Sequence, residues 1–204
     1  MKPEQLKSRI PAFIAMAIAA VLVGVDQLTK WLVVKNIEHG LSVPGVRIGS
    51  FKLFDITHRT NDGAAFSILS GQRWLLIAVT GIFLIGAIVV LFSGRVKRKW
   101  LFASITLIIA GGIGNLIDRI RVGEVVDFIE LQFVRFAVFN FADMCAVVGS
   151  ILLFLIVIAE EIREYRAKKA CEVEEIEETA LASQGGFPAA DEGGLGAEPP
   201  LQDE

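Results

Sequence analysis

The chain has 204 residues, of which 53% are hydrophobic, and its mean hydropathy is +0.58. This composition excludes an ordinary soluble domain and indicates an integral membrane protein. The formal net charge of −3 hides an uneven distribution, because residues 171–204 hold ten of the 23 acidic residues and no Lys or Arg. Residues 1–170 therefore carry 20 basic and 13 acidic residues, a net charge of +7.

Four long segments without charged residues predict four transmembrane helices, since about 20 residues are needed to cross the hydrocarbon core. The segments are residues 10–25, 74–94, 100–117 and 144–159. With their flanks, the predicted spans lie at about 11–33, 73–93, 100–118 and 140–160. The N-terminal segment also resembles a cleaved signal peptide, but its apolar run continues into DQLTKWLVV and favours an uncleaved first helix. The expected fold class is an α-helical integral membrane protein.

Basic residues cluster before the first span, between the second and third, and after the fourth. The positive-inside rule puts these clusters and both termini in the cytoplasm, so that the loops at about 35–72 and 119–139 face outward. In the first loop, VRIGSFKLFDITHRT predicts one or two short strands of a small extracytoplasmic sheet. Residues 166–204 predict a disordered acidic cytoplasmic tail, which follows a membrane domain at residues 1–165.

This topology brings four carboxylates from separate stretches to the outer membrane face. Asp26 lies at the end of the first span, Asp118 at the end of the third, Asp127 in the following loop and Asp143 at the start of the fourth. Three amides join them, those of Asn61, Asn115 and Asn140. A carboxylate at the membrane boundary is costly, so this gathering indicates a functional site.

Local spacing gives several of these residues a structural interpretation. Asp26 and Lys30 are four residues apart, share a helix face and favour a salt bridge at the helix end. Asn115, Asp118 and Arg119 share another helix face, and Arg119 beside Asp118 predicts a second ion pair. The glycines of GGIGNLIDR favour close helix packing, because the motif lacks the Lys-Ser/Thr ending of a phosphate loop.

Asp127 and Asp143 differ from the other carboxylates, because neither has an obvious local cation. Two carboxylates close together in a low-dielectric site tend to share one proton. Such a pair suits an aspartic peptidase, in which one carboxylate takes a proton from water and the other protonates the leaving group. Two separate interfacial carboxylates, each hydrogen-bonded to backbone, would explain the pattern equally well. The residues alone leave both interpretations open.

Five motifs, in this order, resemble the lipoprotein signal peptidase (signal peptidase II) family: DQLTK, NDGAAFS, GGIGNLIDR, VVDF and FNFAD. The resemblance covers roughly residues 10–160. It implies a bacterial inner-membrane aspartyl endopeptidase that cuts the signal peptide of a prolipoprotein before the diacylglyceryl-modified cysteine. It also implies four transmembrane helices, a small outer sheet and a short periplasmic helix from the first outer loop.

The resemblance further implies roles for single residues, with Asp127 and Asp143 as the catalytic pair. The residues that support the pair or bind the substrate are Asp26, Lys30, Asn61, Gly111, Asn115, Asp118, Arg119 and Asn140. No metal or organic cofactor is implied. The implied partners are diacylglyceryl-prolipoproteins and membrane lipid, without nucleic acid, and the implied form is a monomer with its active site on the periplasmic side. The chain departs from the family at Asp62, where a neutral residue is common.

Two other classes of function compete with this interpretation. A proton-coupled carrier would have acidic residues at several depths, whereas the second to fourth spans have none in their inner halves. A non-catalytic assembly factor would use the acidic tail as its interaction element. Deleting the tail distinguishes this last class, because an assembly factor should fail and a peptidase should still cleave.

Overall fold

The computed structural model describes residues 3–63, 68–96 and 98–184. The chain divides into two compact units, Met1–Ile158 and Ala159–Glu204, and each is described by itself. The short helix expected in the first outer loop is not found in the described part of that loop, and residues 64–67 of the loop lie outside the described residues.

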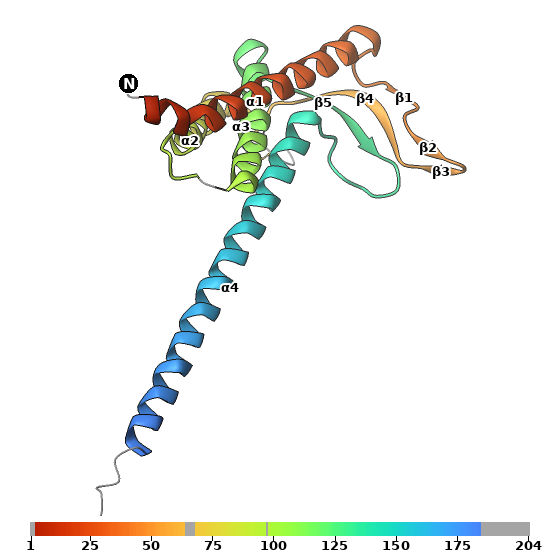
Figure 1. The fold of residues 1–204 in the computed structure, drawn as a ribbon. Helices are drawn as coiled ribbons and strands as arrows, with labels where there is room; N and C mark the ends of the chain where they lie inside the picture. The colour runs from red at the N-terminus through yellow and green to blue at the C-terminus, as the bar shows by residue number, and fades with distance from the viewer. Residues whose placement is uncertain (1–2, 64–67, 97, 185–204) are drawn as a thin grey trace, which may run out of the picture. The chain divides into compact units, whose positions relative to one another are not determined.

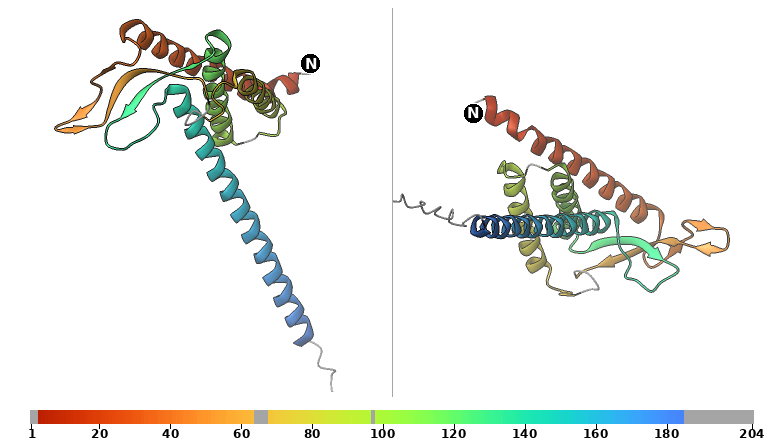
Figure 2. Two further views of the ribbon diagram at one scale, coloured as in Figure 1. Left: turned by 180° about the vertical axis from the view of Figure 1, so that it is seen from behind. Right: turned by 60° about the horizontal axis from the view of Figure 1, so that its bottom comes forward.

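Among the described residues, four helices are long and apolar enough to cross a membrane, which confirms the expected fold class. They are α1 (Pro3–Asn36), α2 (Arg73–Phe92), α3 (Lys99–Arg121) and α4 (Phe141–Gln184). Their candidate spans are Ile10–Asn36, Arg73–Phe92, Lys99–Arg121 and Phe141–Glu174. The third span is the most buried of the four, because α3 packs against both α1 and α2 (Figures 1 and 2).

Glycines let α3 and α4 approach closely. A Cβ atom added at Gly111 would overlap the carbonyl oxygen of Ala142 and would lie 2.7 Å from the amide nitrogen of Ala146. A Cβ atom added at Gly149 would lie 2.9 Å from the backbone nitrogen of Ile108. The glycines of α3 therefore permit close helix packing, as predicted, and they bring the first turns of α4 against α3.

Five strands are found in the described residues, in two small antiparallel sheets. The larger sheet has the order β1 (Ser42–Val43), β4 (Phe54–Asn61) and β5 (Val125–Leu131), and a separate hairpin pairs β2 (Arg47–Ile48) with β3 (Phe51–Lys52). The expected strands in the first loop are thus present. Strand β5 was not predicted, because its first four residues are all buried and VVDFIEL lacks a clear alternation of polar and apolar residues.

The two faces of β5 have different neighbours. Val126 and Phe128 pack with Val33 and Ile37 near the end of α1, and Figure 1 shows β4 and β5 beside this end of the helix. Asp127 points to the opposite face, because successive side chains alternate along a strand. The packing against α1 therefore fixes which face of the sheet carries the Asp127 carboxylate.

Helix α4 extends beyond the expected end of the fourth span. The sequence prediction ended the span near residue 160 and assigned residues 166–204 to a disordered tail, whereas the helix continues to Gln184. This continuation is rich in Ala, Glu, Lys and Arg, which have high helix propensity. Oppositely charged pairs four residues apart, such as Glu164 and Lys168, also favour the helix. Residues 185–204 lie outside the described residues.

Candidate active site

Asp143 lies in the first turn of α4, where it forms a reciprocal cap with Asn140. The backbone N–H of Asp143 donates to Oδ1 of Asn140 at 2.9 Å, and the backbone N–H of Asn140 donates to Oδ2 of Asp143 at 3.1 Å. This is the hydrogen-bond pattern of a capping box, with the acidic residue three positions after the cap. The start of the helix thereby fixes the position of the Asp143 carboxylate.

Asp127 lies in the middle of β5 and is 4% exposed. Its Oδ1 accepts a hydrogen bond of 2.7 Å from Nδ2 of Asn140, and its Oδ2 accepts one of 3.2 Å from Nδ2 of Asn61. Burial, together with the nearby charge of Asp143, raises the pKa of Asp127 to about 7, although both amide hydrogen bonds oppose this shift. Asp127 can therefore hold or release a proton near neutral pH.

Two asparagine side chains connect the carboxylates. Asn140, which is fully buried, binds Asp127 through its side chain and Asp143 through its backbone. Its Nδ2 also donates to Oδ1 of Asn115 at 3.1 Å, and Nδ2 of Asn115 donates to Oδ1 of Asp143 at 2.7 Å. The strand β5 and the helices α3 and α4 thus bring both predicted catalytic residues into one hydrogen-bonded network.

Lys30 of α1 lies at the centre of a buried charge cluster beside this network. Its Nζ is 2.9 Å from Oδ2 of Asp26 and 2.7 Å from Oδ2 of Asp118. The same ammonium donates to Oδ1 of Asn115 at 2.9 Å. The predicted pairing of Asp26 with Lys30 is confirmed, but the predicted partner of Asp118 is wrong. Asp118 pairs with Lys30 and not with Arg119, because consecutive helix residues do not face each other.

Arg119 instead holds the loop that follows β4. Its Nη2 donates to the carbonyl oxygen of Gly63 at 2.6 Å, two residues after Asn61. Asp62 closes the same loop, because its Oδ2 accepts hydrogen bonds from Oγ of Ser70 at 2.5 Å and from the backbone N–H of Gly71 at 3.2 Å. The hydrogen bond from Ser70 keeps the pKa of Asp62 below its usual value. These contacts position Asn61 next to Asp127.

Asp26 links the charge cluster to the start of α4, since its Oδ1 accepts a hydrogen bond of 2.9 Å from the backbone N–H of Ala142. A carboxylate is favourable at this position, because the first N–H groups of a helix have no partner within the helix. A Cβ atom added at Gly114 would lie 2.7 Å from Oδ2 of Asp26. Gly111 and Gly114 thus leave the space in which α1, α3 and α4 meet. Among the described contacts, Gly111 touches neither the Asp127 nor the Asp143 carboxylate.

Gln27 belongs to the site, although its role was not predicted from the sequence. Its Nε2 lies 2.9 Å from Oδ1 of Asp118, 3.2 Å from the carbonyl oxygen of Gly114 and 3.2 Å from Oδ2 of Asp26. The only signal in the sequence is its position inside DQLTK, directly after a carboxylate that faces other helices. The residue supplies N–H groups to two buried carboxylates.

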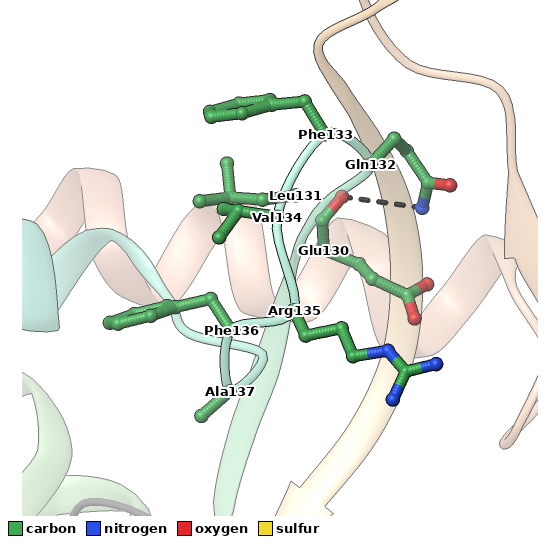
Figure 3. Close-up of a pocket in the computed structure, with 8 residues that line it drawn as sticks. All are labelled: Glu130, Leu131, Gln132, Phe133, Val134, Arg135, Phe136 and Ala137. Carbon is green, nitrogen blue, oxygen red and sulfur yellow. Dashed lines mark hydrogen bonds between the residues drawn. The ribbon is translucent and has the colours of Figure 1, made fainter.

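A surface cavity of about 620 Å³ lies away from this network, in the loop that leads from β5 toward α4. Figure 3 shows Leu131, Phe133 and Phe136 pointing to one side of this loop, whereas Gln132 and Arg135 point to the other. Among the described residues, no three His, Cys, Asp or Glu side chains are grouped so that they could hold a metal ion. The network around Asp127 and Asp143 has acid–base capacity because the pKa of Asp127 is raised to about 7.

Comparisons with known proteins agree with this geometry. A family model described as signal peptidase (SPase) II matches residues 18–159. The lipoprotein signal peptidase of Streptococcus thermophilus is 43% identical over 151 residues, which are 72% of this chain and 94% of the relative. The lipoprotein signal peptidase of Brevibacillus brevis is 38% identical over 138 residues, or 68% of this chain and 90% of the relative.

A solved structure described as a bacterial membrane enzyme superposes with a TM-score of 0.68 at 31% sequence identity. The superposition covers 72% of this chain and 89% of that structure. A second structure with the same description, at 32% identity, gives a TM-score of 0.64 over 71% of this chain. The sequence, the fold and the buried carboxylate network together lead to one assignment: this chain belongs to the signal peptidase II family of membrane proteases.

Proposed function

We propose that this chain removes the signal peptide of diacylglyceryl-modified prolipoproteins with Asp127 and Asp143 as its catalytic pair. The signal peptidase II family cleaves signal peptides from prolipoproteins, and this chain is a protease of that family. One observation carries the assignment of the pair: two carboxylates from different elements are bound by a single buried residue, Asn140.

The two carboxylates have different roles in this proposal. Asp127 is the acid, because its pKa of about 7 leaves it protonated in part of the molecules at neutral pH. Asp143 is the base, because N–H groups donate to both of its oxygens at the start of a helix. Asp143 takes a proton from water while the water oxygen attacks the scissile carbonyl carbon, and Asp127 gives its proton to the carbonyl oxygen.

The resulting diol collapses in the second step. The carbon–nitrogen bond breaks, the leaving nitrogen takes the proton held by Asp143, and one diol hydroxyl returns its proton to Asp127. Both carboxylates are then in their starting forms. Asn115 and Asn140 orient the pair, because each donates an amide N–H to one of the two carboxylates.

In this proposal the active site faces the periplasm, and the chain acts as a monomer in the inner membrane. Its partners are the prolipoprotein substrate and membrane lipid, and it binds no nucleic acid. Basic residues support the orientation, since Arg95 and Arg98 lie between α2 and α3 and Lys99 begins α3, at the ends of these helices away from the sheet connections. The lipid of the substrate lies among the helices, and the cut falls before the lipidated cysteine. The cytoplasmic side then holds both termini.

Cleavage of a purified, diacylglyceryl-modified prolipoprotein tests the proposal. We expect the wild type to release the signal peptide before the modified cysteine, and Asp127→Asn and Asp143→Asn to lose this activity while they remain folded. Glu130→Gln is the matched control, because Glu130 is a carboxylate of the same strand that binds neither member of the pair. Normal cleavage by a folded Asp127→Asn or Asp143→Asn variant would refute the catalytic pair.

A further inference from the structure

Arg59 of β4 is a cation next to the proposed catalytic strand. The β4–β5 ladder pairs Arg59 directly with Asp127, and it pairs Asn61 with Val125. A register shift between Ile56 and Arg59 precedes these pairs. Directly opposed residues of an antiparallel ladder place their side chains on the same face of the sheet. The ladder therefore assigns Arg59 to the face that carries the Asp127 carboxylate.

A hydrogen bond supports this assignment of faces. Nδ2 of Asn61 reaches Oδ2 of Asp127 across the ladder, so these two side chains share a face. Arg59 is two residues before Asn61 in the same strand and has the same orientation. The opposite face of β5 is covered by α1 through Val126. Arg59 thus lies on the same face of the sheet as Asp127, where the Asp127 side chain is buried and the Arg59 side chain is exposed.

The Arg59 side chain is exposed, in contrast to the other cations of the site. Lys30 is 3% exposed and binds two carboxylates, and Arg119 is 9% exposed and binds the carbonyl oxygen of Gly63. Among the described residues, the guanidinium of Arg59 makes no ion pair or hydrogen bond. An exposed guanidinium without a partner is available to a ligand that enters the site.

The chemistry of the substrate indicates what this ligand is. The strands lie between the candidate spans, so Arg59 is outside the apolar part of the protein. The segment of a signal peptide that precedes the cut is apolar, with the basic residues confined to the N-terminal end, and a diacylglyceryl group is uncharged. A cation at this place can therefore distinguish substrates only by the charge of the peptide that follows the cut.

We propose that Arg59 is a specificity-determining residue that binds an acidic side chain in the mature part of the substrate; this proposal rests on the proposed function of Asp127. Opposed Cα atoms of an antiparallel pair lie about 5 Å apart, and an extended peptide advances about 3.4 Å per residue. The acidic side chain is therefore at about the second or third residue of the mature chain. Arginine suits this role because its planar guanidinium can bind a carboxylate through two hydrogen bonds.

The test compares substrates that carry Asp, Asn or Lys at the second or third mature residue. The wild type should cleave the Asp substrate with a kcat/KM about 1.4- to 5-fold above that of the Asn substrate, which is the range for exposed ion pairs. Arg59→Gln should abolish this preference, Arg59→Lys should keep part of it, and Arg59→Glu should reverse it in favour of the Lys substrate. Added salt should weaken the preference of the wild type.

Arg47→Gln is the matched control, because Arg47 is an exposed cation of the separate β2–β3 hairpin. The same preference in wild type and Arg59→Gln would overturn the proposal and leave the catalytic pair intact. An equal loss on all three substrates that depends on anionic lipid would overturn it as well, in favour of binding to membrane head groups. A wild type that cleaves none of the lipidated substrates would contradict the proposed function itself.

Discussion

Replacing Lys30 by Met should destabilise the protein strongly, because it removes the cation that two buried carboxylates share. The side chains of Lys30, Asp26 and Asp118 are 4%, 1% and 8% exposed. Removing one partner of a buried ion pair costs about 3–5 kcal/mol, a large part of the roughly 5–15 kcal/mol that stabilises a typical folded protein. The three residues carry a net charge of −1 in the wild type and −2 in the variant.

A second substitution separates this charge effect from the loss of packing. The Lys30→Met/Asp118→Asn double variant restores the net charge of −1, so it should recover part of the lost stability. Lys35→Met is the control on the same helix, because Lys35 is exposed and lies 4.7 Å from the Trp31 ring centroid. Its expected cost is the roughly 0.5–1 kcal/mol of an exposed cation–π contact.

Thermal unfolding in detergent can be followed through the thiol of Cys145, which is buried in the folded protein. A Cys171→Ser background is needed, since the Cys171 thiol is exposed and would react before unfolding. The midpoint of labelling should fall most for Lys30→Met, less for the double variant and least for Lys35→Met. If Lys30→Met and Lys35→Met unfold at the same temperature, the ammonium does not hold the cluster together and the reasoning fails.

Four further predictions follow from single features of the structure. Burial raises the pKa of folded Asp127 to about 7, whereas in the unfolded chain its pKa has the ordinary value of 3.8. Folding therefore becomes less favourable as the pH rises between these values. Asp127→Asn should therefore raise the unfolding temperature at pH 8, where the gain in free energy of unfolding is up to about 4 kcal/mol. At pH 4 the gain should be small, and an equal rise in unfolding temperature at both pH values would contradict the raised pKa of Asp127. For the same reason, the cleavage rate should fall as the pH rises above about 7, where the proposed acid loses its proton, and a constant rate up to pH 9 would exclude this role. Gly111→Ala should destabilise the protein by about 1–3 kcal/mol because its Cβ meets the backbone of α4, whereas Gly86→Ala in α2, with no atom within 4 Å, should not. A chain that ends at residue 170 should cleave at the wild-type rate, because the family model matches only residues 18–159; loss of cleavage would assign the C-terminal segment to the activity.

The parts of the fold that the sequence predicted are those determined by local patterns. A charge-free run of about 20 residues is sufficient evidence for a span, and all four expected helices are present in the described residues. The pairing of Asp26 with Lys30 follows from their four-residue spacing on one helix. The reciprocal cap between Asn140 and Asp143 was not predicted, although it has a local signature, because the two residues are three apart at the start of an apolar run.

The missed strand depends on contacts between distant segments. Strand β5 is rich in Val, Phe and Ile but lacks a clear alternation of polar and apolar residues, and its partner β4 lies about 68 residues away at the ladder pair of Arg59 with Asp127. The continuation of α4 to Gln184 was missed for a different reason, since the acidic composition suggested disorder although the same residues favour helix. Composition alone did not separate these two outcomes.

The ion-pair partner predicted for Asp118 was wrong, which shows why the contacts of the site can be assigned only from the tertiary structure. Asp118 and Arg119 are neighbours in sequence, yet on a helix their side chains point about 100° apart, so they turn to different segments. Asp118 meets Lys30 of α1, whereas Arg119 meets Gly63 of the loop after β4. This division has a consequence for the proposed chemistry, because Lys30 also donates to Oδ1 of Asn115. With that oxygen occupied, the Asn115 amide presents its N–H to Asp143, so a lysine of α1 orients the proposed base of α4 through a side chain of α3.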